Sequence, residues 1–148
     1  MWILLYLVVM AASAGAVTRH VPVVYPTIQS ALNAVGTGDT ILVEVDTYAE
    51  ELTAPPLSFV MCGNVDIQPG DYPRPVIDPS TLTNPRERLC MTIGAEGVPI
   101  LGQPVIEDFV FRNGAAMYPR SDEGGIINYT GVLLRRCRFD STYVGLTT

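Results

Sequence analysis

The stretch from Thr27 to Tyr48 decides the fold expected for this chain; it reads Thr27-Ile-Gln-Ser-Ala-Leu-Asn-Ala-Val-Gly36-Thr-Gly-Asp-Thr40-Ile-Leu-Val-Glu-Val-Asp-Thr-Tyr48. Its first part carries apolar residues at i, i+3, i+4 and i+7, the spacing of a short amphipathic helix. These residues are Ile28, Ala31, Leu32 and Val35. Thr27 can cap the helix, because its hydroxyl can accept from an unpaired N–H of the first turn. Gly36 and Gly38 are expected to end it, since glycine tolerates positive φ.

The second part of this stretch, from Thr40 to Val45, is rich in β-branched residues and predicts a buried strand. A Thr-Ile-Gln-x-Ala helix, then Gly-Asp-Thr-Ile and a strand, then x-Thr-Tyr-x-Glu, resembles the N-terminal cap of secreted parallel β-helix proteins with the pectin-lyase-like fold. The last of these elements is Asp46-Thr47-Tyr48-Ala49-Glu50. The resemblance implies an all-β chain, a right-handed parallel β-helix (a single-stranded solenoid) with a short capping α-helix inside residues 21–38. It implies little about activity, because this fold carries lyases, hydrolases, esterases, adhesins and structural proteins.

The bulk composition indicates one folded domain with an acidic surface. The chain has 148 residues, of which 48% are hydrophobic and 16% charged, so a packed core is expected and global disorder is not. The net charge is −6, and all nine basic residues are arginines. An acidic chain without a basic run is a poor candidate for binding nucleic acid or an anionic membrane surface.

The first 16 residues are predicted to be a secretory signal peptide. Residues 2–10 form an unbroken apolar run, and residues 11–16 are small, as at signal-peptidase sites. Cleavage after Ala14 or Ala16 would start the mature chain at Gly15 or Val17 and make the protein secreted or cell-surface bound. The alternative is a membrane anchor, but the apolar stretch is shorter than the roughly 18 to 20 residues that a span needs.

The supply of cysteine and histidine argues against zinc and against histidine-based catalysis. His20 is the only histidine, and the cysteines at 62, 90 and 137 have no close spacing of a metal or redox motif. Cys90 lies in Leu-Cys-Met-Thr-Ile and Cys137 in Leu-Leu-Arg-Arg-Cys-Arg-Phe, and both are expected to be small core residues. A Cys62–Cys90 disulfide stays open at this stage, because only geometry can decide it.

Further strands are predicted where β-branched and apolar residues gather between loops rich in glycine and proline. They cover residues 21–25, 57–61, 76–78 and 89–93. Residues 105–113 align with residues 133–141 at an offset of 28, so that Phe111 matches Phe139. Val76 matches Val105 at an offset of 29. In a parallel solenoid such residues stack about 4.8 Å apart in neighbouring coils.

A second resemblance strengthens the solenoid interpretation. Phe111-Arg-Asn-Gly114, then Gly124-Gly-Ile-Ile127 and Cys137-Arg-Phe-Asp140, is similar to the repeats of bacterial β-helix surface proteins. Residues 17–148 are therefore expected to form the cap and about four coils. We expect the solenoid to continue in a longer protein, because bare strands at its end would leave an open edge.

The offset of 28 also pairs charged residues of opposite sign. It places Glu107 on Arg135, Asp108 on Arg136, and Arg112 on Asp140. Opposite charges on adjacent strands stabilise a sheet by roughly 0.2 to 1 kcal/mol, whereas like charges repel. We interpret these six residues as a structural ladder between coils and not as a catalytic cluster, with a bend between two short strands at 107–108 and at 135–136.

Two groups of residues are candidates for binding, each with an ordinary alternative. Tyr118, Arg120 and Asp122 lie in a loop and combine an aromatic ring with charges, as carbohydrate sites do; the alternative is a plain loop. Aspartates at positions 66, 71 and 78 could bind Ca²⁺ if they converge, since this ion takes several oxygen ligands; the alternative is solvated loop charges. No catalytic residue and no other cofactor is predicted.

Two functions remain from the sequence. The first is a secreted or surface β-helix protein with a structural or adhesive role that contacts polysaccharide or cell-surface components. The second is the N-terminal part of a pectate-lyase-like polysaccharide lyase or glycoside hydrolase. The residues needed for catalysis by such enzymes are not recognisable in this stretch, so its being an enzyme stays open.

Overall fold

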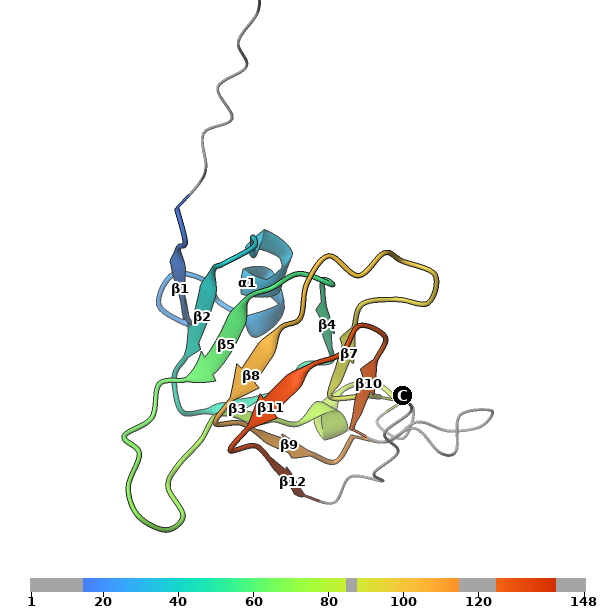
Figure 1. Cartoon of the computed structure of the whole chain (residues 1–148). Coiled ribbons are helices and arrows are strands. Elements are labelled where there is room, and N and C mark those ends of the chain that lie inside the picture. Colours follow the sequence, from blue (N-terminus) through green and yellow to red (C-terminus); the bar gives the residue numbers. More distant parts are fainter. Residues whose placement is uncertain (1–14, 85–87, 115–124, 141–148) are drawn as a thin grey trace, which may run out of the picture.

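The computed structural model describes residues 15–84, 88–114 and 125–140, which form three parallel sheets and one α-helix (Figure 1). The first sheet has the order β1-β2-β5-β8-β11, with strands Thr18–Val21, Thr40–Val43, Val60–Gly63, Val105–Glu107 and Leu133–Arg135. The second has the order β3-β6-β9-β12, with strands Thr47–Tyr48, Val76–Ile77, Val110–Arg112 and Arg138–Asp140. The third has the order β4-β7-β10, with strands Leu52–Ala54, Met91–Ile93 and Ile126–Asn128.

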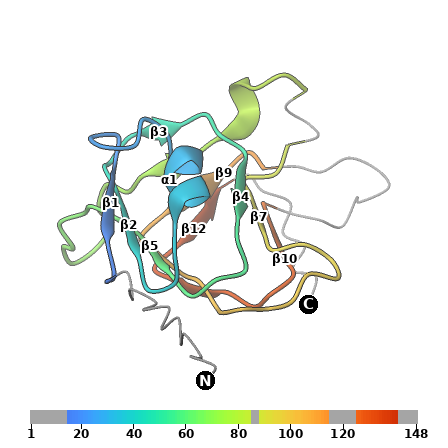
Figure 2. The same cartoon turned by 90° about the horizontal axis from the view of Figure 1, so that it is seen from above.

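The chain visits the three sheets in a fixed sequence. It runs from β2 to β3 to β4, returns to the first sheet at β5, and repeats the circuit through β6 and β7, then through β8, β9 and β10. All neighbouring strands are parallel, which requires such crossovers. Seen from above in Figure 2, the sheets lie around one core and α1 lies over it. This arrangement is compatible with a solenoid-like, mostly β fold.

The helix α1 spans Ile28–Ala34, as the apolar spacing predicts. Thr27 is its N-cap: the Thr27 side chain accepts from the Ser30 N–H at 3.1 Å, and the Ser30 hydroxyl accepts from the Thr27 N–H at 3.3 Å. Ile28, Ala31 and Leu32 are buried and join the core with residues of all three sheets. The predicted Thr27 cap is confirmed, as is the buried stripe at Ile28, Ala31 and Leu32. Val35 is only partly buried and is the C-cap in extended conformation, so the helix ends before the predicted glycines.

Several predicted strand boundaries are wrong by two to four residues. Strand β2 ends at Val43, and Val45 is exposed although it has the same parity as the buried Ile41 and Val43, because it lies beyond the end of the strand. Strand β1 precedes the predicted 21–25 segment, in which Val23 and Val24 are exposed. Strand β5 starts at Val60 and not at 57, because a turn at 55–57 delays it; the Leu57 N–H donates to the Pro55 carbonyl.

The register agrees with one predicted offset and contradicts the other. Phe139 pairs with Phe111, and their rings stack with centroids 5.2 Å apart. Val76, however, pairs with Val110 and not with Val105, which lies against Val60 in another sheet. The predicted offset of 29 was wrong because residues 64–75 form a long excursion between β5 and β6, which shifts that circuit against the next one.

The three cysteines are unpaired, so a Cys62–Cys90 disulfide is not formed. Cys90 is buried, and its thiol donates to the Arg112 carbonyl at 3.4 Å. Burial raises the pKa of Cys90 to about 12, which keeps this thiol protonated and unreactive at neutral pH. Cys90 is a core residue as predicted, whereas Cys137 is only partly buried.

The predicted signal peptide lies almost wholly in residues 1–14, outside the described residues. Among the described residues, no helix has the length and apolar character needed to cross a membrane.

Candidate functional site

Asp39, from the Gly-Asp-Thr-Ile motif, ties three elements of the cap together. Its carboxylate is 5% exposed and accepts from the Val17 N–H and from the Gly36 N–H, both at 2.8 Å. Arg19 of β1 donates to it through Nη2 at 2.6 Å and Nε at 3.1 Å. The two backbone donors and the Arg19 guanidinium lower the pKa of Asp39. This aspartate is thereby committed to holding β1, the end of α1 and the start of β2.

The other two cap motifs also have structural roles. The Glu50 carboxylate accepts from the Ile28 and Gln29 N–H groups, each at 2.9 Å, and satisfies the start of α1. The Gln29 side chain accepts from the Thr53 N–H at 2.7 Å and donates to the Thr53 carbonyl at 3.1 Å. Gln29 therefore imitates a neighbouring strand and pairs the backbone of β4 at its free edge.

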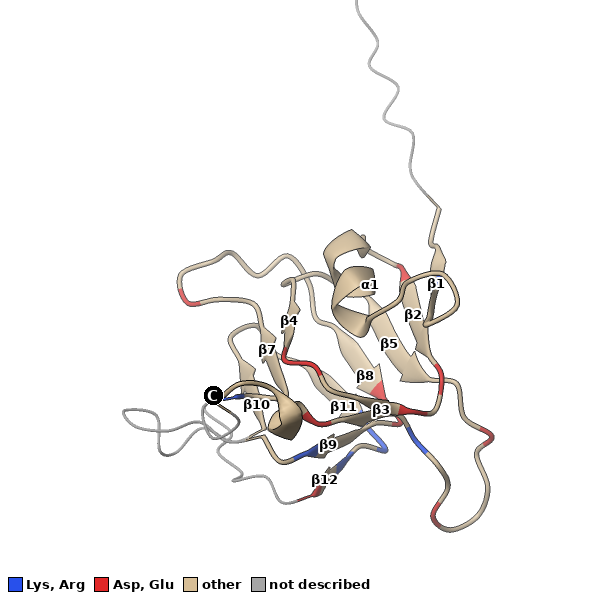
Figure 3. Ribbon diagram, turned by 180° about the vertical axis from the view of Figure 1, so that it is seen from behind, with Lys and Arg blue, Asp and Glu red and all other residues tan. Residues whose placement is uncertain are grey.

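The charged residues at the strand bends form the contacts that the offset of 28 places together. Arg136 donates to both carboxylate oxygens of Asp108, at 2.7 and 2.8 Å, and to Glu107 at 2.6 Å. Arg135 lies 3.2 Å from Glu107, and Arg112 lies 3.8 Å from Asp140. We call these six residues the charge ladder; Figure 3 shows arginines near β9, β11 and β12.

Both bends of the charge ladder turn through a left-handed residue. Asp108 has a φ of +62° and Arg136 has a φ of +52°. The chain therefore turns at the same place in two successive circuits. Asp108 is buried, and the hydrogen bonds from Arg136 lower its pKa well below the usual range. A buried carboxylate so paired is a structural group, ionised at neutral pH.

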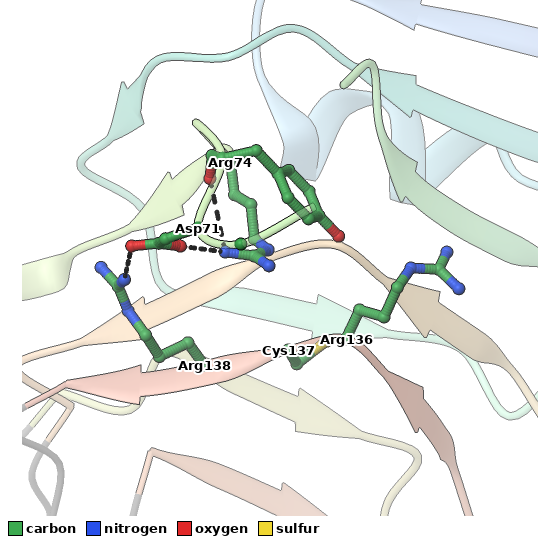
Figure 4. A pocket seen from close by; sticks show the side chains of 7 residues that line it. Asp71, Arg74, Arg136, Cys137 and Arg138 are labelled. Carbon is green, nitrogen blue, oxygen red and sulfur yellow. Dashed lines mark hydrogen bonds and ion pairs between the residues drawn. The ribbon is translucent and has the colours of Figure 1, made fainter. Parts of the chain in front are cut away.

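A hollow of about 620 Å³ lies beside the charge ladder, between the 64–75 excursion and the β11–β12 bend (Figure 4). We call it the arginine hollow, because three of its lining residues are arginines. It is lined by Gly70, Asp71, Tyr72, Arg74, Arg136, Cys137 and Arg138. Sequence-distant residues thus meet here through stacking of successive circuits.

Arg74 lies at the inner wall of the arginine hollow. Its guanidinium carbon lies 3.8 Å from the centroid of the Tyr72 ring, in cation–π contact. Its Nη1 donates to Asp71 at 2.8 Å and to the Tyr72 carbonyl at 3.3 Å. The Tyr72 hydroxyl donates to Asp108, which links the hollow to the charge ladder. Packing on one side and hydrogen bonds on the other fix the position of Arg74.

Asp71 bridges the two walls of the arginine hollow. It accepts from Arg74 and, through its second oxygen, from Arg138 Nη1 at 2.8 Å. The Arg74 hydrogen bond and the charge of Arg138 lower the pKa of Asp71. Burial raises the pKa of Cys137, so its thiol stays protonated at neutral pH. Arg138 also lies 3.0 Å from Asp140, so the guanidiniums of the hollow are paired with carboxylates, the kind of oxygen-bearing group that they match.

Only some of the site residues predicted from the sequence lie together in the structure. It brings the six ladder residues together, while Tyr118, Arg120 and Asp122 lie outside the described residues. Asp78 accepts from the Ser80 N–H and from Asn113, and Asp66 is exposed. Within residues 15–84, 88–114 and 125–140, no group of three or more His, Cys, Asp or Glu side chains is placed to hold a metal ion.

Sequence reasoning missed the arginine hollow. It assigned residues 68–75 to a loop from their proline and glycine content alone. The available signal was Asp71-Tyr-Pro-Arg74, in which an acid, an aromatic ring and a base lie within four residues and can interact locally. The contact with Arg138 needed the register of the circuits.

Compared with models of protein families, with curated protein sequences and with solved structures, the chain gives no match.

Proposed function

We propose that this chain is the cap and first coils of a right-handed parallel β-helix, a secreted or cell-surface protein with a structural or adhesive role that contacts carbohydrate. The ordered visits to three parallel sheets and the cap contacts of Asp39, Glu50 and Gln29 support the fold. The apolar run and small residues within 1–16 support export.

The observation that carries the function is the arginine hollow. Two of its arginines, Arg136 and Arg138, belong to the stacked circuits. The third, Arg74, is held in place against the Tyr72 ring. Donors held in place lose little entropy when they bind, and guanidinium forks match hydroxyl and carboxylate oxygens. The carboxylates nearby are held ionised by arginines, which suits binding more than general acid catalysis.

A binding experiment tests the contact with carbohydrate. Native gel electrophoresis of the full chain through gels that contain neutral or acidic polysaccharides should show retardation by at least one of them. Arg138→Gln should weaken it, whereas Arg88→Gln, which removes an arginine paired with Glu51 outside the hollow, should not. Absence of retardation, or equal effects of the two variants, would contradict the proposal.

The same samples separate binding from catalysis. Release of reducing ends or of unsaturated sugars from a retained polysaccharide would contradict the adhesive role. It would favour the alternative function, a polysaccharide lyase or glycoside hydrolase. Retention without cleavage products is the result that we expect.

A further inference from the structure

Asp71 occupies the place in the arginine hollow that an external ligand would need. Its side chain is 69% exposed, yet it reaches across the hollow to bond Arg74, whose side chain is 11% exposed, and Arg138 on β12. An exposed carboxylate that bridges two guanidiniums from opposite walls has the geometry of a bound oxyanion. Figure 4 shows Asp71 between these two arginines.

The inner arginine has hydrogen-bonding capacity beyond its contacts. Its Nη1 donates to both Asp71 and the Tyr72 carbonyl, whereas its Nε is buried, so a ligand in the hollow would meet the terminal Nη groups and not Nε. Nε carries one of the five N–H donors of a guanidinium and the terminal nitrogens carry the rest, so Arg74 presents more donors than Asp71 can occupy. A ligand oxyanion with three or more oxygens, or a carboxylate with neighbouring hydroxyls, could use them.

We propose that the arginine hollow binds an oxyanion-bearing ligand, and that the Asp71 carboxylate is an internal competitor which the ligand displaces. The displaced contacts are matched, because one charge-assisted set of hydrogen bonds replaces another. Asp71 is placed for displacement, since it lies on the 64–75 excursion and its side chain faces solvent. Ligand charge then sets selectivity, because a neutral ligand cannot replace the Asp71 charge between Arg74 and Arg138.

That the ligand is a carbohydrate with carboxylate or sulfate groups rests on the proposed contact with carbohydrate. A matched series of polymers tests which charged group is bound. Unmodified dextran, carboxymethyl-dextran and dextran sulfate share one backbone and differ only in their charged groups. The full chain should bind the two charged dextrans and not the unmodified one. Tighter binding of one charged form identifies the group; equal binding of all three would overturn the inference while leaving a carbohydrate contact intact.

The Asp71→Asn variant tests the competition directly. It removes the competing charge, so its affinity for the preferred charged dextran should rise about tenfold. Asp66→Asn is the matched control, because this exposed aspartate lies in the same excursion and the change in net charge is identical. Equal affinities of the two variants would overturn the role of Asp71. Arg138→Gln should weaken binding of the charged dextrans, and unchanged binding would also overturn it.

Inorganic sulfate separates this inference from the carbohydrate proposal. Sulfate should raise the unfolding temperature of Asp71→Asn more than that of Asp66→Asn, because a ligand that binds the folded state stabilises it. This result supports the oxyanion site even if no polysaccharide binds. No difference between the variants, over a range of sulfate concentrations at constant ionic strength, would count against it.

Discussion

The cap and the charge ladder both hold strands together with carboxylates, but the hydrogen-bond donors and the burial of these carboxylates differ. Asp39 and Glu50 receive backbone N–H groups at the start and end of α1, and Asp39 is buried. Glu107 and Asp140 instead receive arginine side chains that remain partly exposed. A part-buried backbone N–H that loses its partner is costly to leave unsatisfied, whereas an exposed guanidinium can return to water. The cap should therefore be the more fragile region under mutation.

The largest effect is expected at the apolar face of the cap. Leu32 is 2% exposed and covers one end of the core, so Leu32→Asp would bury an unpaired carboxylate and should lower the free energy of unfolding by about 4 kcal/mol or more. Urea unfolding of the full chain measures it. Asn33→Asp places the same group on the exposed side of α1 and should cost less than about 1 kcal/mol. Similar stabilities of the two variants would show that α1 does not cap the core.

The second effect is the acid sensitivity of the cap. Because the folded-state pKa of Asp39 lies below its ordinary value of 3.8, its contribution to stability is present above that value and is lost as pH falls through the lower, folded pKa. Asp39→Asn should therefore destabilise the chain strongly at pH 7, and the difference from wild type should shrink as the pH is lowered below 3.8 and wild-type Asp39 takes up a proton. Unfolding temperatures measured across this range, with Asp66→Asn as control, decide it; a constant difference would be evidence against the Asp39 contacts.

The third effect lies where the charge ladder becomes buried. Asp108 is 3% exposed and receives two hydrogen bonds from Arg136 and one from Tyr72. Asparagine tolerates the positive φ at this bend, so Asp108→Asn keeps the backbone while it removes the charge and one of the two acceptor oxygens, and it should cost about 1 to 2 kcal/mol. Chemical denaturation measures the loss. Asp46→Asn is the control and should change little, because the Asp46 side chain is exposed and accepts from the adjacent Thr47 N–H.

The comparison also explains which features the sequence could predict. The helix at 28–34 and its Thr27 cap depend on neighbours within four residues, so local patterns predicted them. Residues 105–113 and 133–141 pair at a constant offset, so that one offset predicted their register. The match of Val76 with Val105 failed, because nothing local reveals that residues 64–75 lengthen one circuit. The arginine hollow depends on the same excursion, as Asp71 meets Arg138 across 67 residues.

The smallest effect is expected at the exposed pair of the charge ladder, Arg135 and Glu107. The Arg135 side chain is 53% exposed, and Glu107 keeps a second bond to Arg136 when Arg135 is removed. Arg135→Gln should therefore change the free energy of unfolding by about 0.5 kcal/mol or less, and 0.5 M salt should remove most of that difference. A double-mutant cycle with Glu107→Gln isolates the pair from other effects of each change. A coupling well above 1 kcal/mol that persists in salt would mean that the exposed rung is as rigid as the buried one at Asp108, and the division between a fragile cap and a tolerant charge ladder would fail.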